Sequence, residues 1–287
     1  MGDENLYLLP LTQELLFQQR FEAQQCCVLI PTYNNAKTLK QVLESVLELT
    51  SSVIVVNDGS TDTTREILNE FPQIDIVNFP FNRGKGEALK VGFKKAEELD
   101  YQYAISIDSD GQHFPGDVSV FLKALENRKN GDPDLLVIGS RKMDHIDIPE
   151  KSNIGNRYSS FWFWVETGIK LQDTQCGYRL YPLKLVNSLN LSTSKFELEI
   201  EVIVKAAWSG AEVKNLPVRV FYDPLDRVTH FKPFKDVTRI VILNIWFVFL
   251  KVFYILPKKI FSSQKKSKSS PPKEMRRTNM PPGGNFL

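Results

Sequence analysis

The chain has 287 residues, of which 42% are hydrophobic and 24% are charged, as is ordinary for a soluble globular protein. Its net charge of +2 conceals an uneven distribution, because residues 258–287 hold eight Lys or Arg and one Glu (+7), which leaves about −5 (2 minus 7) for the remainder. A nucleic-acid-binding protein would carry its basic face on the folded part, so nucleic acid is not expected as a partner.

Residues 1–25 form a polar leader that lacks an apolar stretch of signal-peptide length, so we expect the folded part to stay on the cytoplasmic side. The three cysteines, Cys26, Cys27 and Cys176, are odd in number, and their spacing does not fit a zinc site. We therefore expect them to be small buried residues without disulfide bonds.

Apolar runs alternate with segments of helical periodicity in the first half of the chain. The runs predict strands at 27–31, 53–56, 74–79, 103–107 and 135–139, and the periodic segments predict helices after Asn34 and at 61–70, 87–98 and 115–127. Strands that are apolar throughout and alternate with helices indicate an α/β fold, with a Rossmann-like, mostly parallel sheet flanked by helices.

The second half departs from this rhythm. A dense group of aromatic residues between 156 and 170 is compatible either with core packing or with a membrane interface. A helix is predicted at 196–208 and a late strand at 218–222. The main folded domain is therefore expected to extend over residues 26–235.

Residues 236–261 are strongly apolar and are predicted to form a membrane-associated amphipathic helix. The apolar part, 240–256, is short for a spanning helix and contains Asn244 and Lys251, which favours a helix in the membrane plane over a full span. A helix that binds a soluble partner is the alternative. Residues 262–287, rich in Ser, Pro, Gly and Lys, predict a disordered basic tail that adds attraction to anionic headgroups.

Asp108-Ser109-Asp110 directly follows the predicted strand 103–107. In extended backbone the two carboxylates project to the same side, and strand ends are where open α/β sheets bind ligands. Two such oxygen ligands suit Mg²⁺ or Mn²⁺ and leave sites for water and phosphate. A solvated turn is the alternative interpretation of this triplet alone.

Two further polar segments follow strands. Asp58 lies in a turn that either caps the next helix or presents the carboxylate to a nucleobase or ribose. The Gly-rich segment 82–86 precedes a helix, where backbone N–H groups and the Lys85 side chain could face a phosphate. It is neither a Walker loop nor a dinucleotide-binding fingerprint.

Together these motifs resemble the family-two glycosyltransferases of the GT-A fold. The segment 173–181 and Phe196-Glu197-Leu198-Glu199 are similar to the polyprenyl-phosphate mannose or glucose synthase branch, relatives of dolichyl-phosphate mannose synthase. The resemblance implies a nucleotide-sugar donor, a divalent metal and an inverting displacement. The implied nucleotide-sugar contacts are Pro31, Tyr33, Asn35, Asp58, Lys85, Asp108 and Ser109. The implied metal and diphosphate residues are Asp108, Asp110 and Gln112.

The acceptor implied by this branch is a polyprenyl phosphate at the cytoplasmic face of a membrane, where the enzyme would be peripheral or monotopic. A phosphate acceptor needs fixed cations, for which Arg141, Arg157 and Arg179 are candidates. His230 lies in a late segment that resembles a motif closing over such sites. If the acceptor is a hydroxyl, a carboxylate base is required, and Asp173 is the candidate.

Three alternatives remain open from the sequence. The enzyme would transfer its sugar to a hydroxyl of another lipid or glycan, act as a nucleotidyltransferase, or be a non-catalytic sugar-nucleotide or lipid-binding module. The second is disfavoured because no Gly-rich phosphate loop follows the first strand, and the third because both Asp108 and Asp110 are present. Neither the sugar nor the oligomeric state follows from the sequence.

Overall fold

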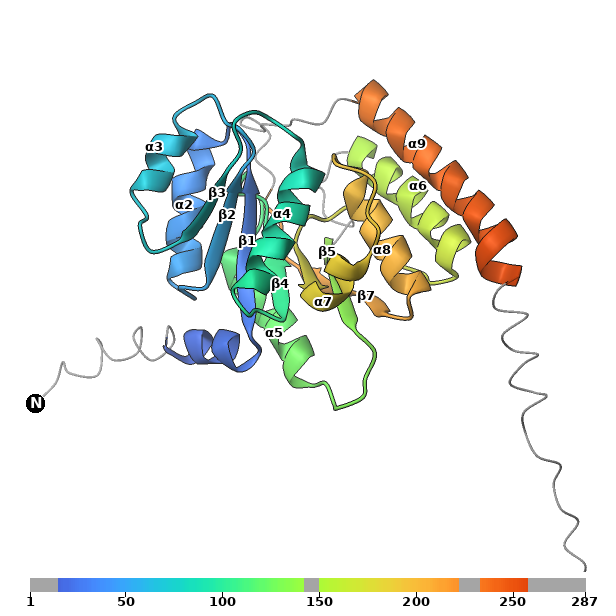
Figure 1. The fold of residues 1–287 in the computed structure, drawn as a ribbon, viewed down its shortest axis with the longest axis horizontal. Coiled ribbons are helices and arrows are strands. Elements are labelled where there is room, and N and C mark those ends of the chain that lie inside the picture. Colours follow the sequence, from blue (N-terminus) through green and yellow to red (C-terminus); the bar gives the residue numbers. More distant parts are fainter. Residues whose placement is uncertain (1–14, 142–149, 222–232, 258–287) are drawn as a thin grey trace, which may run out of the picture. The chain divides into compact units, whose positions relative to one another are not determined.

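A computed structural model describes residues 15–141, 150–221 and 233–257. In these ranges a seven-stranded sheet has the order β3-β2-β1-β4-β6-β5-β7, and only β6 runs against its neighbours (Figure 1). The strands are β1 (Cys26–Thr32), β2 (Val53–Asn57), β3 (Asp75–Asn78), β4 (Tyr103–Ser106), β5 (Leu135–Arg141), β6 (Arg179–Pro182) and β7 (Glu212–Val218). The predicted mostly parallel sheet is confirmed.

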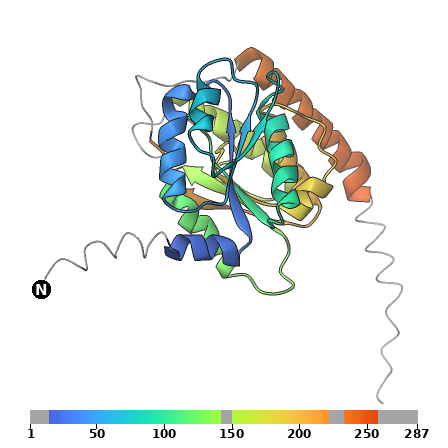
Figure 2. The same cartoon turned by 60° about the vertical axis from the view of Figure 1, so that its left-hand side comes forward.

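Helices cover both faces of this sheet, and Figure 2 shows α2 and α4 on opposite sides of it. Every residue of β1 and β2 is buried, which explains why these strands are apolar throughout. The helices are α2 (Ala36–Leu47), α3 (Thr64–Asn69), α4 (Lys85–Glu98), the 3₁₀ turn η1 (Pro115–Asp117), α5 (Val118–Glu126), α6 (Glu150–Thr167), α7 (Leu183–Ser188), α8 (Leu198–Trp208), α9 (Pro233–Leu250) and the π-helical turn η2 (Lys251–Ile255). Residues 15–23 of the polar leader are also helical.

The late part of the sheet differs from the prediction. The strand predicted at 218–222 is wrong, because β7 ends at Val218 and Val220 makes only an isolated bridge with His113. β7 pairs with β5 alone, and only Val213 and Val218 of its seven residues are buried, so it lacks the continuous apolar run that marks the buried strands. β6 was not predicted, since it is four residues long and begins with an arginine.

Parallel pairing brings the ends of β1, β2 and β4 to one edge of the sheet. Thr32 pairs with Asn57, and Leu29 pairs with Ser106. The polar segments that follow these strands therefore start side by side, which places the Asp58 turn and the Asp108 loop around one space.

Helix α9 begins within the compact unit that holds the sheet, which extends to Phe247, and a second unit begins at Val248. Phe247 is buried, and its ring lies 5.3 Å from that of Trp208 at the end of α8. In the described residues one helix, Phe234–Ile255, has the length and mean hydropathy (1.8) needed to cross a membrane. It is longer than the 17-residue stretch considered from the sequence.

Candidate active site

A cavity of about 640 Å³ lies where the ends of β1, β2 and β4 meet. Its walls come from the segments after these strands, the start of α4, the loop before α8 and the first turn of α9. Eight of the predicted site residues line it, namely Pro31, Tyr33, Asn35, Asp58, Lys85, Asp108, Ser109 and Asp110. The structure thus brings residues from four separate segments to one cavity of a size that suits a nucleotide-sugar.

Asp108 forms an ion pair with Lys85, whose Nζ lies 2.7 Å from Oδ1. Burial by itself would raise the pKa of Asp108, but the charge and hydrogen bond of Lys85, together with the charge of Arg179, outweigh it, and the pKa is lowered. The other carboxylate oxygen lies against Gly177, where an added Cβ would be only 2.2 Å from Oδ2. Asp108 is therefore an anion, and its carboxylate fits at this position only because residue 177 is a glycine without a side chain.

Lys85 also contacts a carboxylate that the sequence analysis left without a role. Its Nζ lies 3.1 Å from Oε2 of Glu199, and Oε1 of Glu199 lies 3.6 Å from Nε of Arg179. Burial would lower the pKa of Lys85, but Asp108 and Glu199 raise it above its usual value. The alternating charges Asp108, Lys85, Glu199 and Arg179 form a chain whose sum is zero.

The loop that carries the two aspartates is fastened by side chains from the first strand's end. Asn35 Nδ2 donates to Ser109 Oγ at 2.7 Å, and that hydroxyl donates to the Pro31 carbonyl at 3.3 Å. Asp110 accepts a hydrogen bond from the Gln112 backbone N–H at 3.0 Å, and the Gln112 carbonyl accepts one from Phe221. Asn35 and Ser109, predicted as nucleotide contacts, thus also hold the Asp108–Asp110 loop in place.

His113 lies just beyond this loop, buried against Tyr178 at 5.2 Å between ring centroids. Burial lowers its pKa to about 4, even though the charge of Asp108 acts in the opposite direction. His113 is therefore neutral at physiological pH and adds no positive charge beside the aspartates.

The start of α4 differs from the expectation of a phosphate cradle. Asp58 accepts hydrogen bonds from the backbone N–H groups of Arg83 (2.6 Å) and Gly84 (2.9 Å), and Ser194 accepts one from Glu87 (2.9 Å). These N–H groups are already satisfied and do not face a ligand. An added Cβ at Gly86 would lie 2.5 Å from the Lys195 carbonyl, so that glycine serves the close approach of the 194–195 loop.

That loop is held by Glu201, which is fully buried in α8. Its carboxylate accepts hydrogen bonds from the backbone and hydroxyl groups of Ser192 and Thr193, and from Lys205. Burial would raise the pKa of Glu201, but these donors lower it to about 2. The cavity wall formed by Lys195 and Phe196 is thus attached to α8 through one carboxylate.

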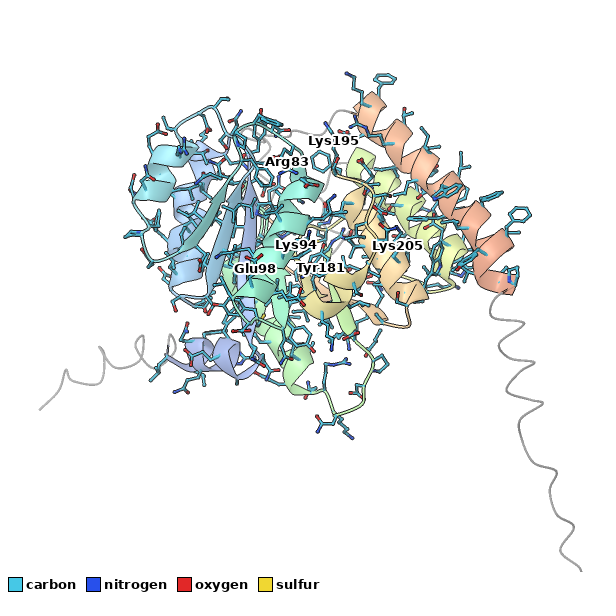
Figure 3. The ribbon with its side chains drawn as sticks, viewed as in Figure 1. Arg83, Lys94, Glu98, Tyr181, Lys195 and Lys205 are labelled. Atoms are coloured by element: carbon cyan, nitrogen blue, oxygen red, sulfur yellow. The ribbon has the colours of Figure 1, made fainter. Side chains whose placement is uncertain are left out.

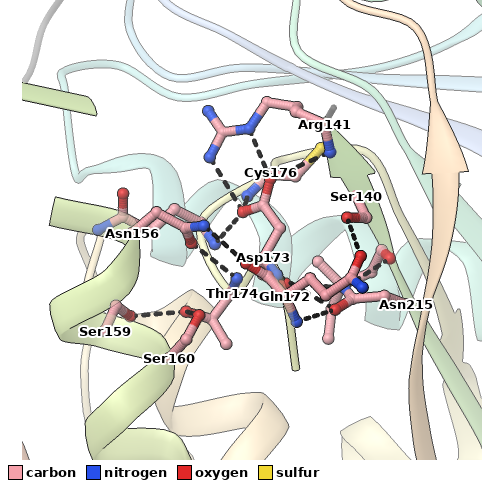
Figure 4. A network of polar contacts seen from close by, with 12 residues as sticks. Ser140, Arg141, Asn156, Ser159, Ser160, Gln172, Asp173, Thr174, Cys176 and Asn215 are labelled. Atoms are coloured by element: carbon pink, nitrogen blue, oxygen red, sulfur yellow. Dashed lines mark hydrogen bonds and ion pairs between the residues drawn. The ribbon is translucent and has the colours of Figure 1, made fainter. Parts of the chain in front are cut away.

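Asp173, the candidate base, is fully buried and lies outside the lining of the cavity. Figure 4 shows Asp173 within a network of polar contacts, next to Arg141. Arg141 donates to it from Nε (2.6 Å), Nη2 (3.0 Å) and the backbone N–H, and the N–H groups of Gln175 and Cys176 donate to Oδ1. Since both oxygens are occupied, the geometry does not support Asp173 as a base. Its observed role is to fix Arg141 at the end of β5.

The remaining cation candidates have different surroundings. Arg179 is fully buried and donates to the carbonyls of Cys176, Glu199 and Thr174, so the geometry does not support it as a contact of the acceptor phosphate. Arg157 is exposed on α6. His230 lies outside the described residues. The three cysteines are free and buried, as expected.

Three cations that sequence reasoning missed line the cavity instead: Lys195, Lys235 and Arg239. Arg239 pairs with Asp236 one turn earlier, at 3.1 Å. Two of them come from the first turns of α9, which the sequence analysis assigned to the membrane or to the end of the catalytic domain. The apolar stretch of this helix gave no signal that its beginning reaches the donor cavity.

The two carboxylates in the cavity, Asp108 and Asp110, fit a divalent metal that also binds a substrate. In the described ranges no group of three or more His, Cys, Asp and Glu side chains is arranged to hold a metal. Asp108 and Asp110 both line the cavity, and Gly177 leaves room for one of the carboxylates. Two carboxylates with remaining positions for phosphate and water are a typical arrangement for Mg²⁺ at nucleotide sites.

Comparison with known proteins agrees with this geometry. The chain is 26% identical over 217 residues to the UDP-N-acetylglucosamine–dolichyl-phosphate N-acetylglucosaminyltransferase of Methanococcus voltae, covering 68% of this chain and 85% of that one. It is 25% identical over 202 residues to the undecaprenyl-phosphate mannosyltransferase of Micrococcus luteus, covering 66% and 81%.

The fold is also that of a solved enzyme. Glucosyl-3-phosphoglycerate synthase from Mycobacterium tuberculosis, in complex with Mn²⁺, UDP and phosphoglyceric acid, matches with a TM-score of 0.58 and 19% identity over 81% of this chain and 80% of that one. This likeness confirms the GT-A fold. The family described as "Glycosyl transferase family 2" matches residues 27–187, and the chain therefore belongs to that family of glycosyltransferases.

Proposed function

We propose that this glycosyltransferase transfers a hexose from a nucleotide-sugar of the GDP-mannose or UDP-glucose type to a polyprenyl phosphate at a membrane surface, with inversion at the anomeric carbon. The observation that carries the proposal is the single cavity that combines Asp108 and Asp110 with three cations, Lys195, Lys235 and Arg239. One set of charges suits a metal-bound diphosphate, and the other suits a second phosphate.

The donor half of the cavity is formed by the ends of β1 and β2. Tyr33 and Asp58 lie there and are proposed to contact the nucleoside, while Asp108 and Asp110, with Gln112, would hold Mg²⁺ or Mn²⁺ beside the diphosphate. The metal would supply charge neutralisation on the leaving diphosphate. Pairing of Asp108 with Lys85, and of Asn35 with Ser109, keeps these groups oriented for the donor.

The acceptor half favours a phosphate over a hydroxyl. A lipid phosphate is already an anion near neutral pH, so its oxygen attacks without a general base, and the occupied carboxylate of Asp173 is consistent with this. Lys195, Lys235, Arg239 and the exposed Arg157 are proposed to attract the phosphate. For a hydroxyl acceptor, Glu199 would be a candidate base, but its carboxylate is engaged with Lys85.

Two helices expose apolar side chains that suit a membrane surface. On α6, Ile154, Tyr158, Phe161 and Trp164 are between 42% and 66% exposed, at helical spacing on one stripe. On α9, Ile242, Ile245 and Trp246 are between 53% and 62% exposed. Trp208 joins the two helices, since its indole donates to the Glu166 carbonyl of α6 and its ring packs on Phe247 of α9. We propose that this surface lies on the cytoplasmic leaflet.

Transfer assays test the reaction. The protein is incubated with radiolabelled nucleotide-sugars, Mg²⁺ or Mn²⁺, and either polyprenyl phosphate or polyprenol. Label that reaches only the phosphate lipid is expected, whereas transfer only to a neutral acceptor would refute the proposal. Asp110→Ala is expected to abolish metal-dependent transfer while thermal unfolding stays cooperative.

Vesicle flotation tests the membrane surface. Trp164→Glu and Trp246→Glu are expected to weaken partitioning to anionic vesicles, because each places a charge in the apolar stripe. Leu16→Glu changes an equally exposed residue (56%) on the helix at 15–23 and serves as the control. Unchanged partitioning of both tryptophan variants would exclude this surface.

A further inference from the structure

The ion pair between Lys85 and Asp108 has a consequence for metal binding that rests on the proposed donor site. Lys85 Nζ lies 2.7 Å from Oδ1 of the aspartate that is expected to ligate the metal. A cation at that oxygen would therefore stand next to an ammonium group, and like charges at such a distance repel strongly in a partly buried site. Metal binding by the free protein must work against Lys85.

Glu199 holds Lys85 at this position from the other side. Its Oε2 lies 3.1 Å from Nζ, and Glu199 is itself 7% exposed and faces Arg179. The four charges from Asp108 to Arg179 sum to zero, and Asp110 adds one negative charge, so a divalent metal alone leaves the site with one uncompensated positive charge. A metal with a nucleoside diphosphate brings its own compensating negative charge.

The protein also offers few other ligands. In the described ranges it presents no cluster of three acidic, histidine or cysteine side chains for a metal, so the remaining positions must be filled by the diphosphate and water. We propose that Lys85, held between Asp108 and Glu199, is a resident counter-ion that makes metal binding dependent on the donor diphosphate. Lys85 is thereby a positioning residue for the metal as well as a nucleotide contact.

The test measures Mn²⁺ binding by the electron paramagnetic resonance signal of the free ion, with and without UDP or GDP. In the wild-type protein, the nucleotide that serves as donor is expected to raise Mn²⁺ affinity about tenfold or more. By linkage, Mn²⁺ raises the affinity for that nucleotide by the same factor, which calorimetry checks independently. Equal Mn²⁺ affinity with and without either nucleotide would overturn the proposal.

Two variants are expected to change nucleotide-free Mn²⁺ affinity in opposite directions. Lys85→Met removes the competing ammonium group and should raise the nucleotide-free Mn²⁺ affinity about tenfold. Glu199→Gln leaves Asp108 as the carboxylate paired with Lys85, which strengthens that ion pair and should lower the Mn²⁺ affinity. Lys94→Met is the matched control, since Lys94 is exposed on the same helix, away from the cavity (Figure 3). It should leave Mn²⁺ affinity unchanged.

Each remaining outcome is decisive. Unchanged or weaker Mn²⁺ binding by a folded Lys85→Met protein, or tighter binding by Glu199→Gln, contradicts the proposal. If Lys85→Met does not unfold cooperatively, the proposal is tested by the Mn²⁺ affinity of Glu199→Gln and by the effect of the nucleotide on Mn²⁺ affinity in the wild-type protein. The measurements need neither sugar nor lipid acceptor, so a failure of transfer to polyprenyl phosphate would refute the proposed function without altering this result.

Discussion

Glu201 offers a quantitative test of how the cavity wall is held. Replacing it with Gln keeps the shape of the side chain but removes the charge and turns an NH₂ group toward donors. The pKa of Glu201 is lowered from 4.5 to about 2 in the folded protein. A difference of roughly 2.5 units corresponds to about 3 kcal/mol of stability at neutral pH.

The pH dependence separates this cause from a general packing defect. Because the folded-state pKa is depressed, the contribution is fully present above about pH 4.5 and is lost as the pH falls through about 2. Glu201→Gln should therefore lose about 3 kcal/mol in urea unfolding at pH 7, or roughly 6 to 12 °C in melting temperature. The difference from wild type should shrink steadily below pH 4.5.

The matched control is Glu212→Gln, since Glu212 pairs with Lys214 at the surface, where both side chains are well exposed. It should change the free energy of unfolding by less than about 0.5 kcal/mol. The reasoning would be refuted if the loss in Glu201→Gln were the same at pH 7 and pH 3. It would also fail if the donor KM were unchanged, because the loop that Glu201 holds carries Lys195.

Two further substitutions test single contacts. Gly177→Ala should lower kcat about 100-fold or more with little loss of stability, because its Cβ would lie 2.2 Å from Asp108 Oδ2. The control is Gly155→Ala, which should be nearly neutral because the atoms nearest to its added Cβ are 3.7 Å away. Equal kinetics of the two variants would exclude the positioning role of Gly177. Asp173→Asn should destabilise the protein by about 3 kcal/mol, because it removes the buried carboxylate charge that pairs with Arg141. A fully active, fully stable variant would show that this pair is dispensable.

The sequence by itself determined the α/β layering and the position of the donor edge. Apolar runs such as 53–56 can only be buried between two layers of helices, and parallel strands necessarily end at one edge, so Asp58 and Asp108 had to meet. The motif set around them was enough to indicate the family. These features are local in sequence, or follow from the direction of the strands.

The tertiary structure alone decided which charges face the cavity. Asp173 and Arg179 looked like free functional groups, but they lie in buried networks whose partners are up to 42 residues away in sequence. Lys195 and the first turns of α9 reach the cavity, and Glu199 reaches Lys85, through packing between elements that no local pattern connects. Whether a charged side chain binds a ligand or stabilises the fold depends on the residues that surround it in space. Those residues are distant in the sequence, so no local sequence pattern identifies them.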